Sequence, residues 1–185
     1  MREIIKFNEI YVKTQASVVG KTEANGPLRA YFDMCERDEY FGTDTWEKAE
    51  SEMARRTLNL LLGKAKLNPE ELELICGGDL LNQCVASSYG VKELGVPFLG
   101  LYGACSTFSE AVICGSTFIH SGGVENAVAF ASSHFCSAEK QYRFPLEYGG
   151  QRTPTAQNTV TGCGAVLLGK EKSPIKVENA MIGRI

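Results

Sequence analysis

The hydrophobic and polar positions of the chain first indicate a long helix between residues 44 and 63. Its apolar positions recur at a spacing compatible with one helix face; they are Trp46, Ala49, Met53 and Leu60. Asp44, with Glu47 three residues later, has the form of a capping box. We therefore expect the helix to begin at Asp44 and to end near Gly63.

Downstream of this helix, short apolar runs of strand length alternate with helical segments. Asn68 and Pro69 offer a cap and a first-turn proline just before the next run. The expected strands span residues 9–19, 72–77, 96–101, 126–132, 164–169 and 175–180, and the further helices span 83–94 and 105–120. This alternation predicts an α/β fold with about five strands in a mixed, mostly parallel sheet and helices on both faces.

Two segments depart from the alternation. The last two expected strands are joined by a short turn at residues 170–174, which predicts a hairpin. The stretch from Ser133 to Thr161 is rich in Gly, Pro, Thr, Gln and aromatic residues and has no sustained period, so we expect a long loop. A long loop inside a compact domain is often functional.

Length and composition fit one soluble domain covering residues 1–185. Hydrophobic residues make up 44% of the chain, yet no apolar run is long enough to span a bilayer. The first six residues lack the features of a signal peptide, which favours a cytoplasmic-type protein. A net charge of -3 without a dense Lys/Arg run argues against a nucleic-acid partner.

The cysteines form no Cys-x-x-Cys pair, which favours reduced and mostly buried thiols over disulfides or a zinc site. They are Cys35, Cys76, Cys84, Cys105, Cys114, Cys136 and Cys163. Cys105 differs because residues 101–108 have the pattern of a strand end, a small-residue turn and a helix start. A helix start stabilises a thiolate or a bound carboxylate, so a nucleophile, an anion cradle and a cysteine packed in a tight turn all remain open.

Three further polar residues are candidates for a functional or a structural role. His134 follows an expected strand at the edge where open α/β sheets place ligands, whereas His120 fits a structural role at a helix end. A catalytic dyad of Cys105 with His134 lacks support, because it needs hydrogen-bond distance and an orienting third group. Asp79 fits helix capping, through Asn82, better than calcium binding, which takes about six to eight oxygens.

The expected loop carries cations and amides that suit a carboxylate ligand. The planar guanidinium of arginine can bond both carboxylate oxygens, so Arg143 and Arg152 are candidates beside Gln151, with solvated surface charges as the alternative. Lys140 and Asn158 lie in the same segment. The aromatic residues of the loop either stack on a ring ligand or pack the loop down; they are Tyr142, Phe144 and Tyr148.

Two segments, residues 101–108 and 160–168, resemble the amino-terminal half of the thiolase and ketoacyl synthase superfamily. In that superfamily a nucleophilic cysteine follows the third core strand at a buried helix start, and a Gly-Asp-Gly-Ala-like segment precedes a later strand. Cys105 matches the first motif, whereas Cys163 stands where the second often has Asp. The resemblance covers nearly the whole chain and implies one thiolase-like half.

Five motifs, in the right order, are similar to the stage V sporulation protein AD family; they are Gly78–Gln83, Gly103–Thr107, Ala131–His134, Glu147–Gln151 and Thr159–Gly162. The resemblance implies a non-catalytic sporulation and germination protein. Such a protein would bind dipicolinic acid or its calcium chelate, and would assist its passage across the spore inner membrane with other stage V proteins. The candidate ligand-binding residues, with no metal site and no other cofactor, are Cys105, Ser106, His134, Arg143, Gln151 and Arg152.

The family architecture contains a second, similar half that this chain lacks, so we expect an excised piece, a cleavage product or a split-gene product. The superfamily's catalytic His and its partner come from that second half. An acyltransferase using Cys105 as nucleophile is therefore the alternative function rather than the first. An isolated half should expose apolar surface on the helix after Cys105, which predicts a homo-oligomer, and membrane association would come through partners.

Overall fold

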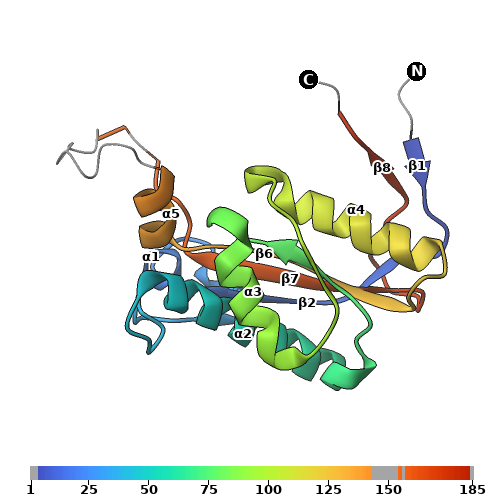
Figure 1. The fold of residues 1–185 in the computed structure, drawn as a ribbon, viewed down its shortest axis with the longest axis horizontal. Helices are drawn as coiled ribbons and strands as arrows, with labels where there is room; N and C mark the ends of the chain where they lie inside the picture. Colours follow the sequence, from blue (N-terminus) through green and yellow to red (C-terminus); the bar gives the residue numbers. More distant parts are fainter. Residues whose placement is uncertain (1–3, 143–153, 156, 184–185) are drawn as a thin grey trace.

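The computed structural model describes residues 4–142, 154–155 and 157–183, and its centre is a six-stranded sheet (Figure 1). In sheet order the strands are β3 Met34–Cys35, β2 Tyr11–Val19, β7 Gly162–Gly169, β6 Asn126–Ser133, β4 Ile75–Gly78 and β5 Phe98–Gly100. A separate antiparallel pair is formed by β1 Ile4–Lys6 and β8 Asn179–Met181.

The directions of the strands place most of their carboxyl ends at one edge of the sheet. β2 runs parallel to β3, and β4 runs parallel to both β5 and β6. β7 is antiparallel to both of its neighbours, β2 and β6. Five strands therefore end at the same edge, where open α/β sheets bind ligands. The expected mixed, mostly parallel sheet is confirmed, with six strands in place of about five.

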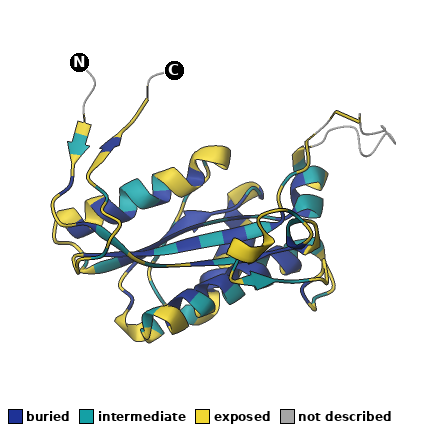
Figure 2. Ribbon diagram, turned by 180° about the vertical axis from the view of Figure 1, so that it is seen from behind, coloured by how far each residue is buried: buried dark blue, intermediate teal, exposed yellow. Residues whose placement is uncertain are grey.

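The two central strands read as nearly continuous apolar runs because both of their faces are covered. Residues 127–130 of β6 are all fully buried. Figure 2 shows the strands of the sheet coloured mainly as buried or intermediate, with exposed residues concentrated on the outer helix faces and loops. Burial on both faces is the usual reason for such runs in mostly parallel sheets.

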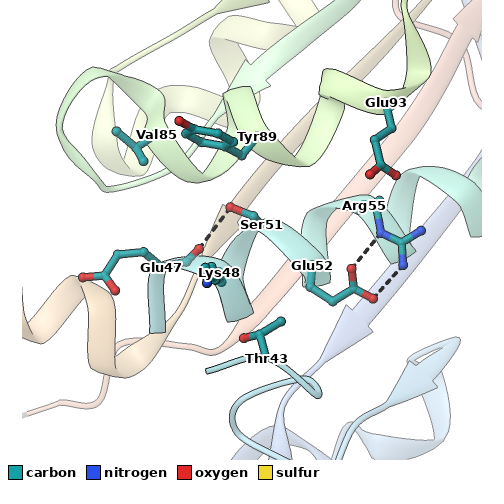
Figure 3. Close-up of a pocket in the computed structure, with 9 residues that line it drawn as sticks. All are labelled: Thr43, Glu47, Lys48, Ser51, Glu52, Arg55, Val85, Tyr89 and Glu93. Carbon is teal, nitrogen blue, oxygen red and sulfur yellow. Dashed lines mark hydrogen bonds and ion pairs between the residues drawn. The ribbon is translucent and has the colours of Figure 1, made fainter. Parts of the chain in front are cut away.

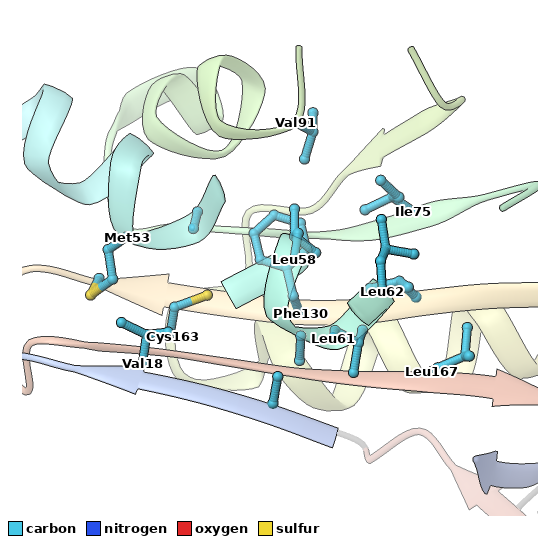
Figure 4. Packing of buried hydrophobic residues seen from close by; sticks show 14 of the residues in the cluster. Val18, Met53, Leu58, Leu61, Leu62, Ile75, Val91, Phe130, Cys163 and Leu167 are labelled. Atoms are coloured by element: carbon cyan, nitrogen blue, oxygen red, sulfur yellow. The ribbon is translucent and has the colours of Figure 1, made fainter. Parts of the chain in front are cut away.

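Helices cover both faces of the sheet, as expected. α2 Trp46–Ala65 and α3 Val85–Val91 lie on one face, α4 Thr107–His120 lies on the other, and the short α1 Lys21–Ala24 follows β2 (Figure 1). α5 Phe135–Tyr142 stands at the carboxyl edge of the strands. Leu58, Leu61 and Met53 of α2 pack onto Phe130 and its neighbours to form the larger core cluster (Figure 4).

The start of α2 corrects the capping prediction. Thr45, not Asp44, is the N-cap residue, and its Oγ1 accepts a hydrogen bond of 3.2 Å from the backbone N–H of Lys48. Asp44 instead forms an ion pair with the Lys48 side chain at 2.7 Å. The Asp44–Glu47 capping box was therefore wrong by one residue, because a neighbouring hydroxyl competes for the same cap position.

Two expected helices begin later than the sequence pattern suggests. Gln83 and Cys84 adopt left-handed backbone angles, with φ of 62° and 52°, so the single helix expected over residues 83–94 is broken and α3 starts at Val85. Cys105 lies in a 3-10 helix, Ala104–Ser106, and α4 begins only at Thr107.

The hairpin predicted at the end of the chain was wrong. β7 already pairs with β2 on one side and β6 on the other, so it has no free edge for a later strand. The chain instead returns beside β2, where the Val12 N–H donates to the Ile175 oxygen at 2.9 Å, and then pairs as β8 with β1. The long loop expected over residues 133–161 was wrong in part, because α5 begins at Phe135.

Candidate functional site

The candidate site lies where β4, β5 and β6 end at the carboxyl edge of the sheet. Gly78 closes β4, and a Cβ added there would overlap with the carbonyl oxygen of Leu101. Only glycine lets the end of β5 approach β4 this closely. This close approach brings the turn that contains Cys105, within residues 101–108, to the same edge as the end of β6. We call it the Cys105 turn.

The Cys105 turn is held by hydrogen bonds from its neighbours rather than by the cysteine itself. Ser106 Oγ donates to the Gly103 oxygen at 2.8 Å and also contacts the Glu110 carboxylate. The Gly103 N–H donates to Thr107 Oγ1 at 3.1 Å. Cys105 itself is exposed, and its thiol has no hydrogen-bond partner among the described residues.

A pocket of about 320 Å³ lies beside this turn, between it and α5. Its lining residues are Leu80, Ala104, Ala138, Glu139, Tyr142 and Thr159. The volume is at the lower end of the roughly 300–1,000 Å³ that small-molecule pockets occupy. Cys105 is not one of the lining residues, but it follows the lining residue Ala104 directly in the chain.

α5 forms one wall of the pocket and is tied to the ends of β4 and β5. The Tyr102 hydroxyl lies 2.5 Å from the Tyr142 hydroxyl and donates to Asn82 Oδ1 at 3.1 Å. The Asn82 N–H donates to Gln141 Oε1 at 3.3 Å. Desolvation, followed by the contact with Tyr102, raises the pKa of Tyr142 to about 12, so the phenol stays neutral and can donate a hydrogen bond.

Glu50 of α2 holds α5 in place through hydrogen bonds. This residue was not identified from the sequence. Its carboxyl group is fully buried in α2, where Oε2 accepts from Ser137 Oγ at 2.6 Å and Oε1 accepts from Ser132 Oγ at 3.1 Å. Burial raises the pKa of Glu50 to about 7, and the charge of Asp79 adds to the rise. The sequence did contain a signal for it: a glutamate on the apolar face of the predicted helix, one turn before Met53.

His134 has both of its ring nitrogens hydrogen-bonded within the protein. Its side chain is buried against the rings of Trp46 and Phe41. Nε2 donates to the Glu39 oxygen at 2.8 Å and Nδ1 accepts from the Cys136 N–H at 3.2 Å. Burial lowers its pKa, which favours this neutral form. Both ring nitrogens are occupied, so the structure does not bring His134 and Cys105 together as a dyad.

Asp79 caps a helix, as expected, but through a different residue. Its Oδ1 accepts from the Leu81 N–H and its Oδ2 from the Ser87 N–H, both at 2.7 Å. Ser87 is the third residue of α3, so Asp79 accepts from a helix-terminal N–H group there, in place of the expected contact with Asn82. The described residues contain no group of three or more His, Cys, Asp or Glu side chains placed to hold a metal ion.

The remaining candidates are divided between the described and undescribed parts of the chain. Lys140 forms an ion pair with Glu47 at 2.7 Å, so its positive charge already has a partner. Asn158 is exposed. His120 packs its ring edge-on against Phe7, with centroids 5.9 Å apart, at the end of α4. The candidates outside the described residues are Arg143, Phe144, Tyr148, Gln151 and Arg152.

The cysteines are free, as expected, but only three of the seven, Cys76, Cys84 and Cys163, are buried. All seven cysteines lie in the described residues, all are free, and Cys105 alone is exposed. Burial raises the pKa of Cys76 and of Cys163 to about 12, so these thiols remain protonated and unreactive near neutral pH.

A larger pocket of about 500 Å³ lies between α2 and α3, on the outer side of the helix layer (Figure 3). Its charged residues already neutralise one another: Glu52 accepts from both Arg55 and Arg56 at 2.7 Å, and Lys48 pairs with Asp44. Tyr89 and Val85 of α3 face this charged helix surface across the pocket. Paired charges offer little to a polar ligand, so we favour the pocket beside Cys105.

Solved structures with this fold define the class of protein. The priming β-ketosynthase of the R1128 polyketide pathway superposes with a TM-score of 0.57 at 16% identity, covering 91% of this chain and 52% of its own. The 3-oxoacyl-[acyl-carrier-protein] synthase III of Aquifex aeolicus VF5 gives 0.54 at 20% identity, covering 94% and 55%. The fold, with its cysteine-bearing turn at the carboxyl edge, is thiolase-like.

Sequence comparison resolves the family within this class. The family model for stage V sporulation protein AD matches residues 2–185. The stage V sporulation protein AD of Bacillus subtilis (strain 168) is 38% identical over 176 residues, which cover 95% of this chain and 52% of that protein. This chain belongs to the stage V sporulation protein AD family, and it spans about half the length of the curated relative it matches.

We expect Glu50→Gln to change how stability depends on pH. The pKa of Glu50 rises from 4.5 to about 7 on folding, so the folded state binds more protons between these values. Stability should therefore fall as the pH rises through this window, by roughly 3 kcal/mol in all. Glu50→Gln keeps hydrogen-bonding groups for Ser132 and Ser137 but cannot ionise, so it should be more stable than the wild type at pH 8.

Urea denaturation at pH 5 and pH 8 measures this effect. The stability advantage of Glu50→Gln should be largest at pH 8 and should shrink towards pH 5. Glu70→Gln, at an exposed position, is the matched control and should show no such trend. An equal difference between Glu50→Gln and the wild type at both pH values would contradict the assignment of the raised pKa to Glu50.

Proposed function

We propose that this chain is the dipicolinate-binding half of a sporulation protein, with the ligand beside Cys105. The observation that carries the proposal is the pocket of about 320 Å³ between the Cys105 turn and α5, in a chain of the stage V sporulation protein AD family. In this proposal the protein is not a catalyst. It binds dipicolinic acid, or its calcium chelate, and helps it across the spore inner membrane during sporulation and germination.

The lining of the pocket suits the calcium chelate. Glu139 contributes a carboxylate to the lining, and its oxygens are of the kind that coordinate calcium. A calcium ion accepts oxygens from several sources at once, including protein carboxylates. The Tyr142 ring supplies an aromatic surface for the pyridine ring, and Arg143, Gln151 and Arg152 remain proposed partners of the ligand carboxylates.

The proposed path to the membrane is indirect. Within the described residues, no helix is both long enough and apolar enough to cross a bilayer. We propose that the protein reaches the spore inner membrane peripherally, through other stage V sporulation proteins that span it.

A second candidate function rests on the exposed Cys105 thiol in a ketosynthase-like fold. Exposure at a strand-to-helix turn is a geometry in which a cysteine can act as a nucleophile toward a thioester. His134 cannot serve as its base in this arrangement, because Glu39 and Cys136 occupy both ring nitrogens. We therefore rank an acyltransferase below the binding function.

The proposed oligomer rests on the outer face of α4. This helix is apolar on both sides: Ala111 and Ile119 are buried against the sheet, while Phe108 and Phe118 are 39% and 43% exposed. β1 and β8 rise on the same side of the sheet and leave Ile4 and Met181 exposed (Figure 1). An apolar surface of this kind favours association.

Calorimetric titration of dipicolinate, with and without calcium, tests the primary function. It should be carried out on this 185-residue chain and on a full-length family protein in parallel. We expect binding that strengthens with calcium, and a loss of about tenfold or more in Arg143→Gln/Arg152→Gln, because charge-assisted hydrogen bonds are lost. Lys172→Gln removes an exposed charge elsewhere and is the control.

Binding by both proteins would locate the site on the residues named here. Binding by the longer protein alone would mean that its second half completes the pocket. A folded full-length protein that takes up no dipicolinate at millimolar concentration, with or without calcium, would refute the proposal.

Incubation with acyl-CoA followed by mass spectrometry tests the acyltransferase. An enzyme of this type should gain one acyl group on the peptide that contains Cys105, and Cys105→Ala should gain none. We expect no adduct on that peptide in the wild type. A stoichiometric adduct that depends on Cys105 would reverse our ranking of the two functions.

Sedimentation velocity tests the proposed oligomer. The wild-type chain should self-associate as its concentration rises, and Phe108→Ser/Phe118→Ser should shift it toward the monomer by removing apolar contact area. Tyr31→Ser is the control, because Tyr31 is 80% exposed and lies away from α4. A wild-type chain that stays monomeric at high concentration would contradict the proposal.

A further inference from the structure

A polar pocket of about 360 Å³, separate from the pocket beside Cys105, is lined by residues from one stretch of chain after β2. Its lining residues are Lys21, Ala24, Asn25, Arg29, Cys35 and Arg37. They come from α1, from the 3-10 helix Arg29–Tyr31, and from the end of β3 with the residues after it. Three cations and one amide therefore share the lining with the apolar Ala24 and the Cys35 thiol.

Within the described residues, these cations have no carboxylate partner: none forms an ion pair with Lys21, Arg29 or Arg37. Glu36, beside Arg37 in sequence, is engaged elsewhere, because its Oε2 accepts from Arg56 Nη1 at 2.8 Å. Glu23 Oε1 accepts from the Thr161 N–H at 3.2 Å, and its buried Oε2 has no hydrogen-bond partner among the described residues.

The backbone explains why the positive groups gather on one side. Cys35 pairs with Val19 of β2, and the Glu36 N–H continues this contact by donating to the Val19 oxygen at 2.8 Å. Side chains alternate along extended backbone, so Cys35 and Arg37 face the pocket while Glu36 turns toward α2. The fold thus separates the carboxylate from the cations that flank it.

This pocket is far from the Cys105 turn. It lies at the β3 end of the sheet, and the Cys105 turn follows β5 at the opposite end. Five strand spacings of about 4.8 Å separate the two ends, which is roughly 24 Å. The two sites can therefore be occupied and tested independently.

We propose that this pocket binds a small organic oxyanion that carries a phosphate or two carboxylates. Two guanidinium groups and an ammonium group provide charge-assisted donors, and the arginine fork suits phosphate and carboxylate oxygens. The cavity is larger than one phosphate group needs, so the anion has room for an organic body against Ala24 and Cys35. The inference does not depend on dipicolinate binding beside Cys105.

Protection of Cys35 from alkylation tests the proposal with inorganic phosphate as the probe. Cys35 lines the pocket, whereas the exposed Cys105 at the other end of the sheet is an internal reference. Iodoacetamide labelling of the wild-type chain, resolved by peptide mass spectrometry, should slow at Cys35 and not at Cys105 when phosphate is added. Sodium chloride at equal ionic strength separates binding from screening.

Two double variants locate the effect. Arg29→Gln/Arg37→Gln should need at least about tenfold more phosphate for the same protection, because charge-assisted hydrogen bonds are lost. Lys6→Gln/Lys172→Gln removes the same charge from exposed positions outside the pocket and should behave like the wild type. The buried Cys76 and Cys163 should stay unlabelled in every variant, which verifies that each is folded.

Vesicles distinguish a free anion from a lipid headgroup. Protection of Cys35 by phosphatidylglycerol vesicles but not by phosphatidylcholine vesicles would identify the oxyanion as a headgroup, and protection by inorganic phosphate alone would identify a soluble ligand. Either result supports the pocket. Absence of protection by both probes, or equal protection in Arg29→Gln/Arg37→Gln, would overturn the proposal.

Discussion

The antiparallel placement of β7 between β2 and β6 is the constraint on which the rest of the structure depends. β7 pairs along its whole length with both neighbours, and these three strands hold the two halves of the sheet together. Because β7 alone is reversed, the other five strands end at one edge. Both candidate pockets, at the β3 end and at the β5 end, exist at that edge for this reason.

The pocket beside Cys105 depends on a buried polar group rather than on apolar packing alone. Glu50 joins α2 to the end of β6 and to α5 through Ser132 and Ser137, and its raised pKa shows that the ionised form is disfavoured there. A hydrophobic residue at this position would lose both hydrogen bonds; the Ser132 hydroxyl would lose its acceptor, while Ser137 would keep only the His134 carbonyl oxygen at 3.1 Å. The position of the pocket wall thus depends on a group that destabilises the fold when it ionises.

The sequence predicted the helices and strands, which local periodicity controls. It did not predict strand pairing and the exact cap residues, which depend on tertiary contacts. The strands β2, β4, β5, β6 and β7 were found from runs of apolar residues, and burial is continuous in β4 and in the middle of β6. The hairpin at the end of the chain was wrong because strand pairing depends on which edges are already occupied. Asp44 was predicted as the cap and Thr45 takes that role, because both are good cap residues and the backbone conformation decides between them. The cations at residues 21, 29 and 37 have no common period, so only the turn after β2 brings them together.

The exposed face of α4 connects assembly to ligand binding. Phe108 lies one helical turn after Cys105, so whatever covers this face in a longer or oligomeric protein must also lie close to the pocket. The covering surface would exclude water from the exposed thiol and lower the local dielectric, which strengthens every charged contact there. The basic pocket lies at the β3 end of the sheet, whereas α4 packs chiefly against β6 and β4, near the other end. The two ends of one edge therefore differ physically: ligand binding at the Cys105 end should depend on assembly, whereas anion binding at the β3 end should not.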